Sequence, residues 1–214
     1  MITIYPSLMA ADQLNLESEV RILKNYCAGF HLDVMDNHYV PTITWGAATV
    51  NVIAQIAVVW VHLMIDNPMV FYEQLVLKPE SLVSFHIESD IDFFDIIKII
   101  KEKKHKLSIA ISPKTPISRI VPFLNIIDQV LLMSVEPGFS GQPFLISAVD
   151  RISEVVAYRQ EYQCSFRIGV DGGINKNNIA MLVEKGMDDC AVGNGIFHNE
   201  DPVAALQELK ILTQ

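Results

Sequence analysis

The chain has 214 residues, half of them apolar, which is enough for one domain with a well-buried core. Its formal net charge of −9 would repel a phosphate backbone or an anionic membrane surface, so nucleic acid and membranes are not expected partners. A small phosphorylated ligand stays compatible with this charge, because backbone N–H groups can hold a phosphate without an excess of Lys and Arg.

The cysteines and the first residues predict a cytoplasmic protein. Cys27, Cys164 and Cys190 are widely spaced and form no Cys-x-x-Cys pair, so reduced thiols are expected rather than disulfides or a thiolate zinc site. Residues 1–6 lack the basic and apolar regions of a signal peptide. The apolar stretch 50–65 is interrupted by polar residues and is shorter than the ~20 residues that a membrane helix needs.

Short apolar runs end in a polar or small residue about every 27 residues along the chain. The residues at these ends are Ser7, Asp33, His62, His86, Ser112, Ser134, Asp171 and Gly193. This spacing is the length of one strand, one helix and two loops, so eight such units are expected. The sequence therefore predicts an α/β fold, a single (β/α)8 TIM barrel with parallel strands over residues 1–214. A doubly wound open sheet is disfavoured, because residues 6–11 after the first run contain no glycine.

Helical patterns lie between these runs. The first is expected from Leu16 to Cys27, where apolar residues recur on one helical face, with a stop at Gly29. Another is expected over residues 91–104, with its lysines toward the C-terminal end. Pro122 predicts a short or kinked helix over 117–125. Asn175 and Asp201 are expected to be N-caps, the latter before a proline at the first helical position.

Two histidines and two aspartates are expected to meet at one mouth of the barrel. His31 and Asp33 are two residues apart and so share a face of their strand, while His62 and Asp171 belong to two other strands. Together they predict a divalent-metal site that shares its pocket with a pair of acid/base carboxylates. Taken alone, each histidine could instead be a hydrogen-bonded core residue. For His86, with no such partner expected on its strand, the core role is favoured.

Glycine-rich loops after the sixth, seventh and eighth runs predict a phosphate site, because barrel phosphate sites commonly use the loops after the last strands. The residues concerned are Gly138, Phe139, Ser140, Gly141, Gly172, Gly173, Gly193 and Asn194. The expected ligand is a small-molecule sugar phosphate. Three methionines near strand ends, Met35, Met64 and Met133, are either core filling or an apolar wall against a planar reaction intermediate.

At this point the chain resembles a known family. The motifs HLDVMDNHYVP at 31–41, VHLM at 61–64, LMSVEPGF at 132–139 and VDGGI at 170–174 are similar to signatures of the ribulose-phosphate 3-epimerases. The resemblance covers nearly the whole chain, in order, from Pro6 and Ser7 to Gly193.

The resemblance implies an isomerase that inverts carbon 3 of D-ribulose 5-phosphate to give D-xylulose 5-phosphate through a cis-enediolate. His31, Asp33, His62 and Asp171 would hold one divalent metal ion, and Asp33 and Asp171 would also transfer the protons. Ser7 and His62 would contact the substrate, and the glycine loops would hold its phosphate. Zinc, iron(II), manganese and cobalt all suit the donor set. The family resemblance is compatible with a homo-oligomer, either a dimer or a hexamer.

Some positions depart from the common family pattern, namely Ser140, Asn194, Ser112 and Thr42, and the Leu8-Met9 pair is closer to the related allulose 6-phosphate 3-epimerases. D-allulose 6-phosphate is therefore an alternative substrate. A decarboxylase of the orotidine-monophosphate type would be expected to carry an Asp-x-Lys-x-x-Asp motif near the third strand, where this chain reads HLMID. A catalytically silent sugar-phosphate-binding barrel is the non-enzyme alternative, and it predicts the loss of at least one of the four donors.

Overall fold

Eight parallel strands form a ring at the centre of the molecule. The computed structural model describes residues 2–214. The strands are β1 (Thr3–Pro6), β2 (Phe30–Met35), β3 (Val59–Met64), β4 (Leu82–His86), β5 (Lys106–Ile111), β6 (Gln129–Met133), β7 (Arg167–Asp171) and β8 (Asp189–Val192). They pair in the order β1-β8-β7-β6-β5-β4-β3-β2, and a parallel bridge between Ser7 and His31 joins the two ends of this order. The predicted TIM barrel is confirmed.

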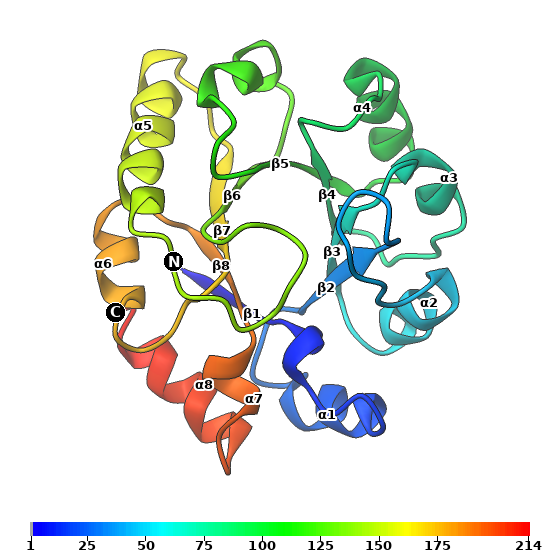
Figure 1. Cartoon of the computed structure of the whole chain (residues 1–214), viewed down its shortest axis with the longest axis vertical. Coiled ribbons are helices and arrows are strands. Elements are labelled where there is room, and N and C mark those ends of the chain that lie inside the picture. Colours follow the sequence, from blue (N-terminus) through cyan, green and yellow to red (C-terminus); the bar gives the residue numbers. More distant parts are fainter. Residues whose placement is uncertain (1) are drawn as a thin grey trace.

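Helices cover the outside of this ring, as Figure 1 shows. The α-helices are α1 (Leu16–Leu23), α2 (Ala47–Ile56), α3 (Pro68–Glu73), α4 (Phe93–Glu102), α5 (Ser147–Glu161), α6 (Ile179–Glu184), α7 (Asn194–Phe197) and α8 (Pro202–Ile211). Two 3-10 helices, η1 (Leu8–Ala10) and η2 (Ile117–Phe123), lie after β1 and between β5 and β6. Because each strand is covered by a helix outside and by side chains inside, the strands are almost wholly buried.

The helix ends follow local sequence signals in most places. Asp201 caps α8 by accepting hydrogen bonds from two backbone N–H groups, and Pro202 is its first residue, as predicted. Pro122 lies inside the 3-10 helix η2, where a regular α-helix was not expected. The helix predicted from Leu16 ends at Leu23, earlier than its apolar pattern suggested, because Tyr26 N–H bonds to the Leu23 carbonyl in a turn.

The prediction that Asn175 caps a helix is wrong. The α6 helix begins at Ile179, and Asn178 occupies its N-cap position. The side chain of Asn175 instead accepts a hydrogen bond of 2.9 Å from the N–H of Asn177, which closes an Asx turn before the helix. The polar run 175–178 contains three asparagines, so more than one of them could cap the helix, and Asn175 forms the turn instead.

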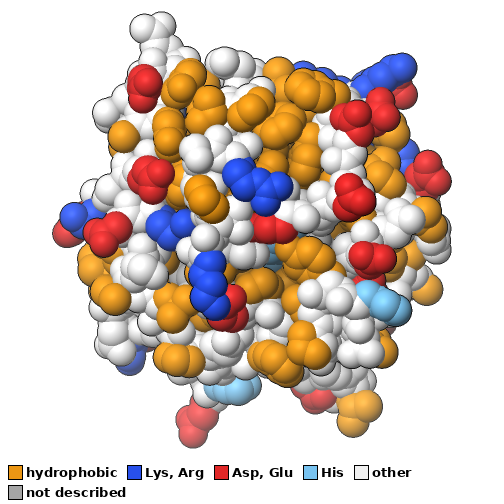
Figure 2. Space-filling model, turned by 45° about the horizontal axis from the view of Figure 1, so that its top comes forward, with side chains coloured by type: hydrophobic (Ala, Val, Ile, Leu, Met, Phe, Trp, Pro, Cys, Tyr) orange, Lys and Arg blue, Asp and Glu red, His pale blue; other side chains and the backbone are white. Residues whose placement is uncertain are grey.

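The interior has an apolar layer between strands and helices and a separate cluster inside the ring. The inner cluster contains Trp60, Leu82, Leu131 and Met133. These side chains fill the interior of the barrel below its C-terminal mouth. None of the helices within residues 2–214 is long and apolar enough to cross a membrane. On the face seen in Figure 2, acidic and basic side chains are scattered among hydrophobic ones and form no large basic patch.

Candidate active site

The strand register brings the predicted histidines and aspartates to one end of the barrel. Within β2, His31 and Asp33 share a face, and Asp33 lies opposite His62 of β3. Asp171 is the last residue of β7. Because β7 and β2 are separated in the ring by β8 and β1, the two aspartates reach the site from different sides of the barrel.

The four side chains meet within a few ångströms. Oδ1 of Asp33 lies 3.0 Å from Nε2 of His31 and 3.0 Å from Nδ1 of His62. Oδ2 of Asp171 lies 3.5 Å from the same nitrogen of His31 and 3.4 Å from that of His62. One ligand atom from each residue is thus within 4.8 Å of all the others. The structure therefore brings together all four residues that the sequence singled out.

Burial makes the charges of this cluster interact strongly. His31 and His62 are fully buried. Although burial disfavours a protonated imidazole, the carboxylates of Asp33 and Asp171 raise the pKa of His31 to about 10, and they raise the pKa of His62 as well. Burial also disfavours the ionised carboxyl of Asp33, but the two imidazoles hold its pKa well below the usual range. Two carboxylates thus attract positive charge to one buried point.

The donor set fits a divalent metal ion. Two imidazole nitrogens and two carboxylate oxygens are a mixed set that suits zinc, iron(II), manganese or cobalt. A divalent cation would balance the two carboxylates, which in its place draw protons onto the histidines. The four residues could therefore hold one metal ion.

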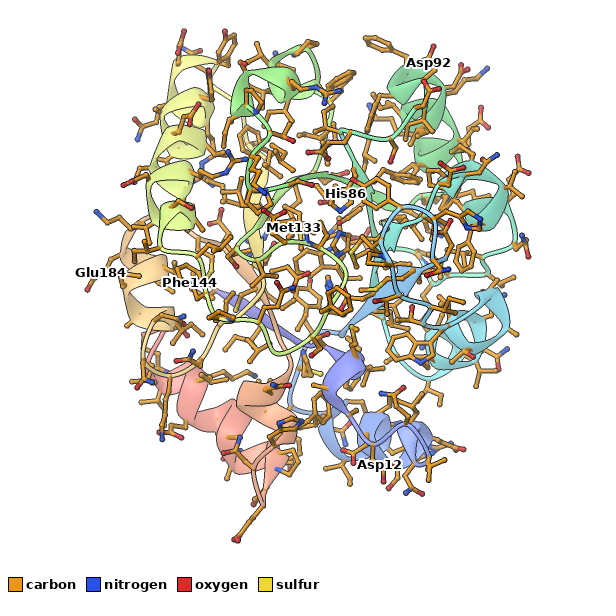
Figure 3. All side chains as sticks on the ribbon, in the orientation of Figure 1. Asp12, His86, Asp92, Met133, Phe144 and Glu184 are labelled. Atoms are coloured by element: carbon orange, nitrogen blue, oxygen red, sulfur yellow. The ribbon has the colours of Figure 1, made fainter. Side chains whose placement is uncertain are left out.

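A cavity of about 270 Å³ opens beside these donors. Asp33 and Asp171 line it, and so do all the other residues predicted to bind substrate except His62: Ser7, Met35, Met64, Met133, Gly138, Phe139, Ser140, Gly141, Gly172, Gly173, Gly193 and Asn194. In Figure 3 the labelled Met133 lies inside the ring of strands, whereas Glu184 points outward from α6. His62 is wholly buried and lies behind the aspartates rather than on the cavity wall.

The cavity wall also contains residues that the sequence analysis did not assign to substrate binding. Met9, Val135, Gln142, Phe144 and Asn175 line it. Each lies in the segment between a strand and the next α-helix, so a search of every loop after β1, β6 and β7 would have found them. The amide of Gln142 donates to the carbonyl oxygens of Glu136 and Phe139 and so fixes the shape of the β6 loop.

The glycines of the loop after β7 are there for steric reasons. Gly172 and Gly173 have φ of 117° and 65°, which favour glycine. A Cβ on Gly173 would lie 2.7 Å from the backbone nitrogen of Phe144, so the β7 loop packs directly on the chain after β6. The Ser134 hydroxyl adds hydrogen bonds to the carbonyls of Asp171 and Gly172. The backbone of these loops is thus held close to the cavity.

His86 is part of the site, although the sequence favoured a separate core role. It is fully buried, as expected, but its Nε2 lies 2.8 Å from Nε2 of His62. No partner was expected on its strand, which ends at His86, but its Nδ1 lies 3.1 Å from Oε2 of Glu88, two residues beyond the strand. Burial lowers the pKa of His86 to about 4, so its ring is neutral at pH 7.

Fold and site together define a class of protein: a TIM barrel with paired carboxylates and a candidate metal centre beside a glycine-lined cavity. The model of the ribulose-phosphate 3 epimerase family matches residues 3–197. The chain belongs to the ribulose-phosphate 3-epimerase family, and its members are carbohydrate epimerases.

Relatives match over nearly the whole chain. The sequence is 36% identical to a ribulose-phosphate 3-epimerase of Aquifex aeolicus over 210 residues, which cover 97% of this chain and 95% of that protein. It is 36% identical to one of Helicobacter pylori over 213 residues, covering 98% and 97%. A crystal structure of KGPDC from Streptococcus mutans has a TM-score of 0.73 at 11% identity, covering 99% of this chain and 97% of that one. At that identity the match shows a shared fold.

Proposed function

We propose that this enzyme interconverts D-ribulose 5-phosphate and D-xylulose 5-phosphate by inverting carbon 3. The observation that carries the proposal is the meeting of Asp33 and Asp171, from different sides of the barrel, at one cavity that also adjoins His31 and His62. Inversion next to a carbonyl requires removal of a proton from one face of the carbon and delivery of a proton to the other. Two opposed carboxylates supply these two steps.

Asp33 and Asp171 are therefore assigned as the two proton-transfer groups. One carboxylate takes the C3 proton onto an Oδ atom and leaves a planar cis-enediolate, and the other carboxyl returns a proton from the opposite face. The roles exchange when the reaction runs in reverse. Ser7, whose hydroxyl contacts Asp33, lines the same cavity and is positioned to contact the sugar.

The metal ligands are assigned as His31, Asp33, His62 and Asp171. When bound, the cation would act as a Lewis acid that stabilises negative charge on the substrate oxygens by several kcal/mol. Zinc, iron(II), manganese and cobalt all fit this set of donors. Because the histidines are neutral donors, they add no negative charge to the two carboxylates.

The remaining lining residues are assigned to substrate positioning. Met35, Met64 and Met133 are almost wholly buried and present apolar, polarizable side chains to the cavity, suited to one face of a planar enediolate. The loops after β6, β7 and β8 would hold the phosphate through backbone N–H groups, at Gly138 to Gly141, Gly172, Gly173, Gly193 and Asn194. Holding the phosphate there would fix carbon 3 between the carboxylates. The proposed contact of His62 with substrate would have to reach past the aspartates.

D-allulose 6-phosphate is the second candidate substrate. The Leu8-Met9 pair resembles the epimerases of that sugar, and Met9 lines the cavity. The silent-barrel alternative requires that a donor be missing, whereas all four donors are present and in contact.

Exchange of the carbon 3 proton with deuterium from the solvent distinguishes these candidate functions. The purified protein, loaded with metal and placed in D2O, should incorporate deuterium at carbon 3 of ribulose 5-phosphate and yield xylulose 5-phosphate, and a chelator should stop both processes. Allulose 6-phosphate in a parallel reaction identifies the preferred sugar by its kcat/KM. A metal-loaded sample that exchanges neither sugar would exclude the epimerase function.

We also infer a cytoplasmic homo-oligomer that binds neither nucleic acid nor membranes. The free thiols of Cys27, Cys164 and Cys190 suit a reducing compartment. The apolar side chains of Ile43 and Val70 are exposed beside α2 and α3, as is common at contacts between subunits. Sedimentation of the purified protein measures its oligomeric state.

A further inference from the structure

A chain of hydrogen bonds connects His62 to a carboxylate outside the donor set. Nδ1 of His62 faces Asp33, and its other nitrogen, Nε2, lies 2.8 Å from Nε2 of His86. Nδ1 of His86 lies 3.1 Å from Oε2 of Glu88. We propose that Glu88 and His86 are positioning residues that hold the ring of His62 with its N–H on Nε2 and its Nδ1 turned toward the metal site. This inference rests on the proposed function, in which His62 is a metal ligand.

The proton positions follow from which atoms can donate. An ionised carboxylate only accepts hydrogen bonds, so the hydrogen between Glu88 and His86 belongs to Nδ1 of His86. A neutral imidazole has a single N–H, so Nε2 of His86 is an acceptor. The contact between the two Nε2 atoms then requires the hydrogen to be on His62. A metal ion that displaced the proton of Nδ1 would then bind a nitrogen that already points toward the site.

The ring geometry agrees with this direction of donation. The ring centroids of His62 and His86 are 5.0 Å apart and the planes are inclined by only 21°. With nitrogens at 2.8 Å, the rings meet end to end in nearly one plane, which is the geometry of an N–H···N hydrogen bond. The ring of Tyr39 packs against His86 at a centroid distance of 5.0 Å and limits its rotation.

Glu88 is itself held in place. Its Oε1 accepts a hydrogen bond of 2.9 Å from the backbone N–H of Ser112, at the end of β5. The Thr115 side chain also bonds to this carboxylate. A carboxylate fixed by the neighbouring strand end cannot rotate away from His86 without losing these bonds. The orientation of His62 is therefore set from the loop after β5, on the side of His62 remote from the cavity.

The reverse arrangement is unfavourable. If Nε2 of His62 lacked the hydrogen, the contact would need a donor on His86, and His86 would have to hold protons on both nitrogens. That would place a cation at a fully buried position. Glu88 accepts one hydrogen bond, from Nδ1 of His86, and this leaves Nε2 of His86 free to accept from His62.

The test uses Co²⁺ alone, because its visible absorption reports nitrogen and carboxylate coordination. Glu88→Gln replaces the obligatory acceptor by an amide that can also donate, and His86→Phe removes the acceptor for His62. Each should weaken Co²⁺ affinity by about 10–100-fold, the usual effect of losing such a partner. His86→Gln places an amide oxygen near the position of Nε2 and should restore most of the affinity. Glu102→Gln, on the exposed side of α4, is the matched control and should bind as the wild type does.

The ¹⁵N spectrum of metal-free protein gives a second readout, which does not depend on activity. His62, assigned by the loss of its signals in His62→Asn, should show a protonated Nε2 in the wild type, and this preference should weaken in Glu88→Gln. Wild-type Co²⁺ affinity in both Glu88→Gln and His86→Phe, or a wild-type His62 without a proton on Nε2, would overturn the positioning role. Either result would leave the proposed function standing if the wild type still epimerises. Absence of epimerisation in a protein with Nε2 of His62 protonated and the expected affinities would instead contradict the function alone.

Discussion

The hydroxyl of Ser7 donates a hydrogen bond of 3.1 Å to Oδ2 of Asp33. The other oxygen of the same carboxylate, Oδ1, faces the ring nitrogens of His31 and His62. The two oxygens of Asp33 thus have different surroundings, one among the nitrogen donors and one beside a residue of the cavity wall. This arrangement suits the two roles proposed for Asp33, as a metal ligand and as a proton acceptor.

Asp33→Asn and Asp171→Asn should each reduce epimerisation by about 10²–10⁴-fold, because each removes one of two proton-transfer groups. The remaining carboxylate can still exchange the C3 proton that faces it. Each variant should therefore exchange the proton of at most one epimer with D2O, and the two variants should act on opposite epimers. NMR of both pentulose phosphates measures this, with Asp90→Asn, in an exposed loop, as control. A variant that exchanges the C3 proton of both epimers would contradict the assignment of Asp33 and Asp171 to opposite faces of the substrate.

Gly173→Ala should damage the proposed phosphate site. Its φ of 65° and the 2.7 Å approach of a Cβ to the backbone of Phe144 force the loop after β7 away from the chain after β6. We expect KM for the sugar phosphate to rise at least about tenfold, a loss of roughly 1.4 kcal/mol of binding. Gly46→Ala is the control, since a Cβ there meets nothing within 4 Å. As an N-cap substitution it should cost up to about 1 kcal/mol of stability and leave KM unchanged. Equal KM values in the two variants would contradict the site.

Protonation of Glu88 should lower the free energy of unfolding at acid pH. Burial opposes its ionisation, but hydrogen bonds from His86 and Thr115 outweigh this effect and lower its pKa to about 2. In the unfolded chain Glu88 takes up a proton near its usual pKa of 4.5, whereas the folded protein resists protonation until about pH 2. The stabilisation is thus complete above pH 4.5 and is lost as the pH falls toward 2, by up to about 1.4 kcal/mol per pH unit.

Urea unfolding of metal-free protein at a series of pH values measures this contribution. The free energy of unfolding should fall less steeply with acid in Glu88→Gln than in the wild type below pH 4.5. Glu102→Gln should follow the wild-type curve. Parallel curves for Glu88→Gln and the wild type would show that the carboxylate is not stabilised by its neighbours.

Asp189→Ala should lower stability without changing the chemistry. Asp189 begins β8, at the end of the barrel away from the active site, and is almost wholly buried. It accepts hydrogen bonds from Arg167 and from the amide of Gln129. Removing the carboxylate leaves the buried amide of Gln129 without this acceptor and should cost about 1–3 kcal/mol of unfolding free energy. Glu184→Gln, which points outward in Figure 3, should cost little. A large change in kcat per folded molecule of Asp189→Ala would contradict the separation of stability from function.

The barrel and the four donors could be predicted because both depend on regular spacing. A repeat of strand and helix fixes the order of the strands, and a two-residue spacing places His31 and Asp33 on one face. The connection from His62 to His86 could not be predicted in this way. In the pairing of β3 with β4, His62 lies opposite Ser84, which is two residues before His86. The contact between the two histidines therefore depends on how far their side chains extend along the neighbouring strand. The turn at Asn175 was missed because adjacent asparagines compete for the same capping geometry.

The bridge between Ser7 and His31 is where the barrel closes, and both of its residues belong to the candidate active site. On its other side, β1 pairs with β8, and the Ser7 N–H bonds to the carbonyl of Val192. Contacts between residues so distant in the chain tend to form late in folding. A refolding intermediate in which β1 has not docked would lack both the hold of Ser7 on Asp33 and the backbone support of His31. Tight cation binding should therefore appear only in the last kinetic phase of refolding. The time course of cation binding would then measure when β1 docks and the barrel closes.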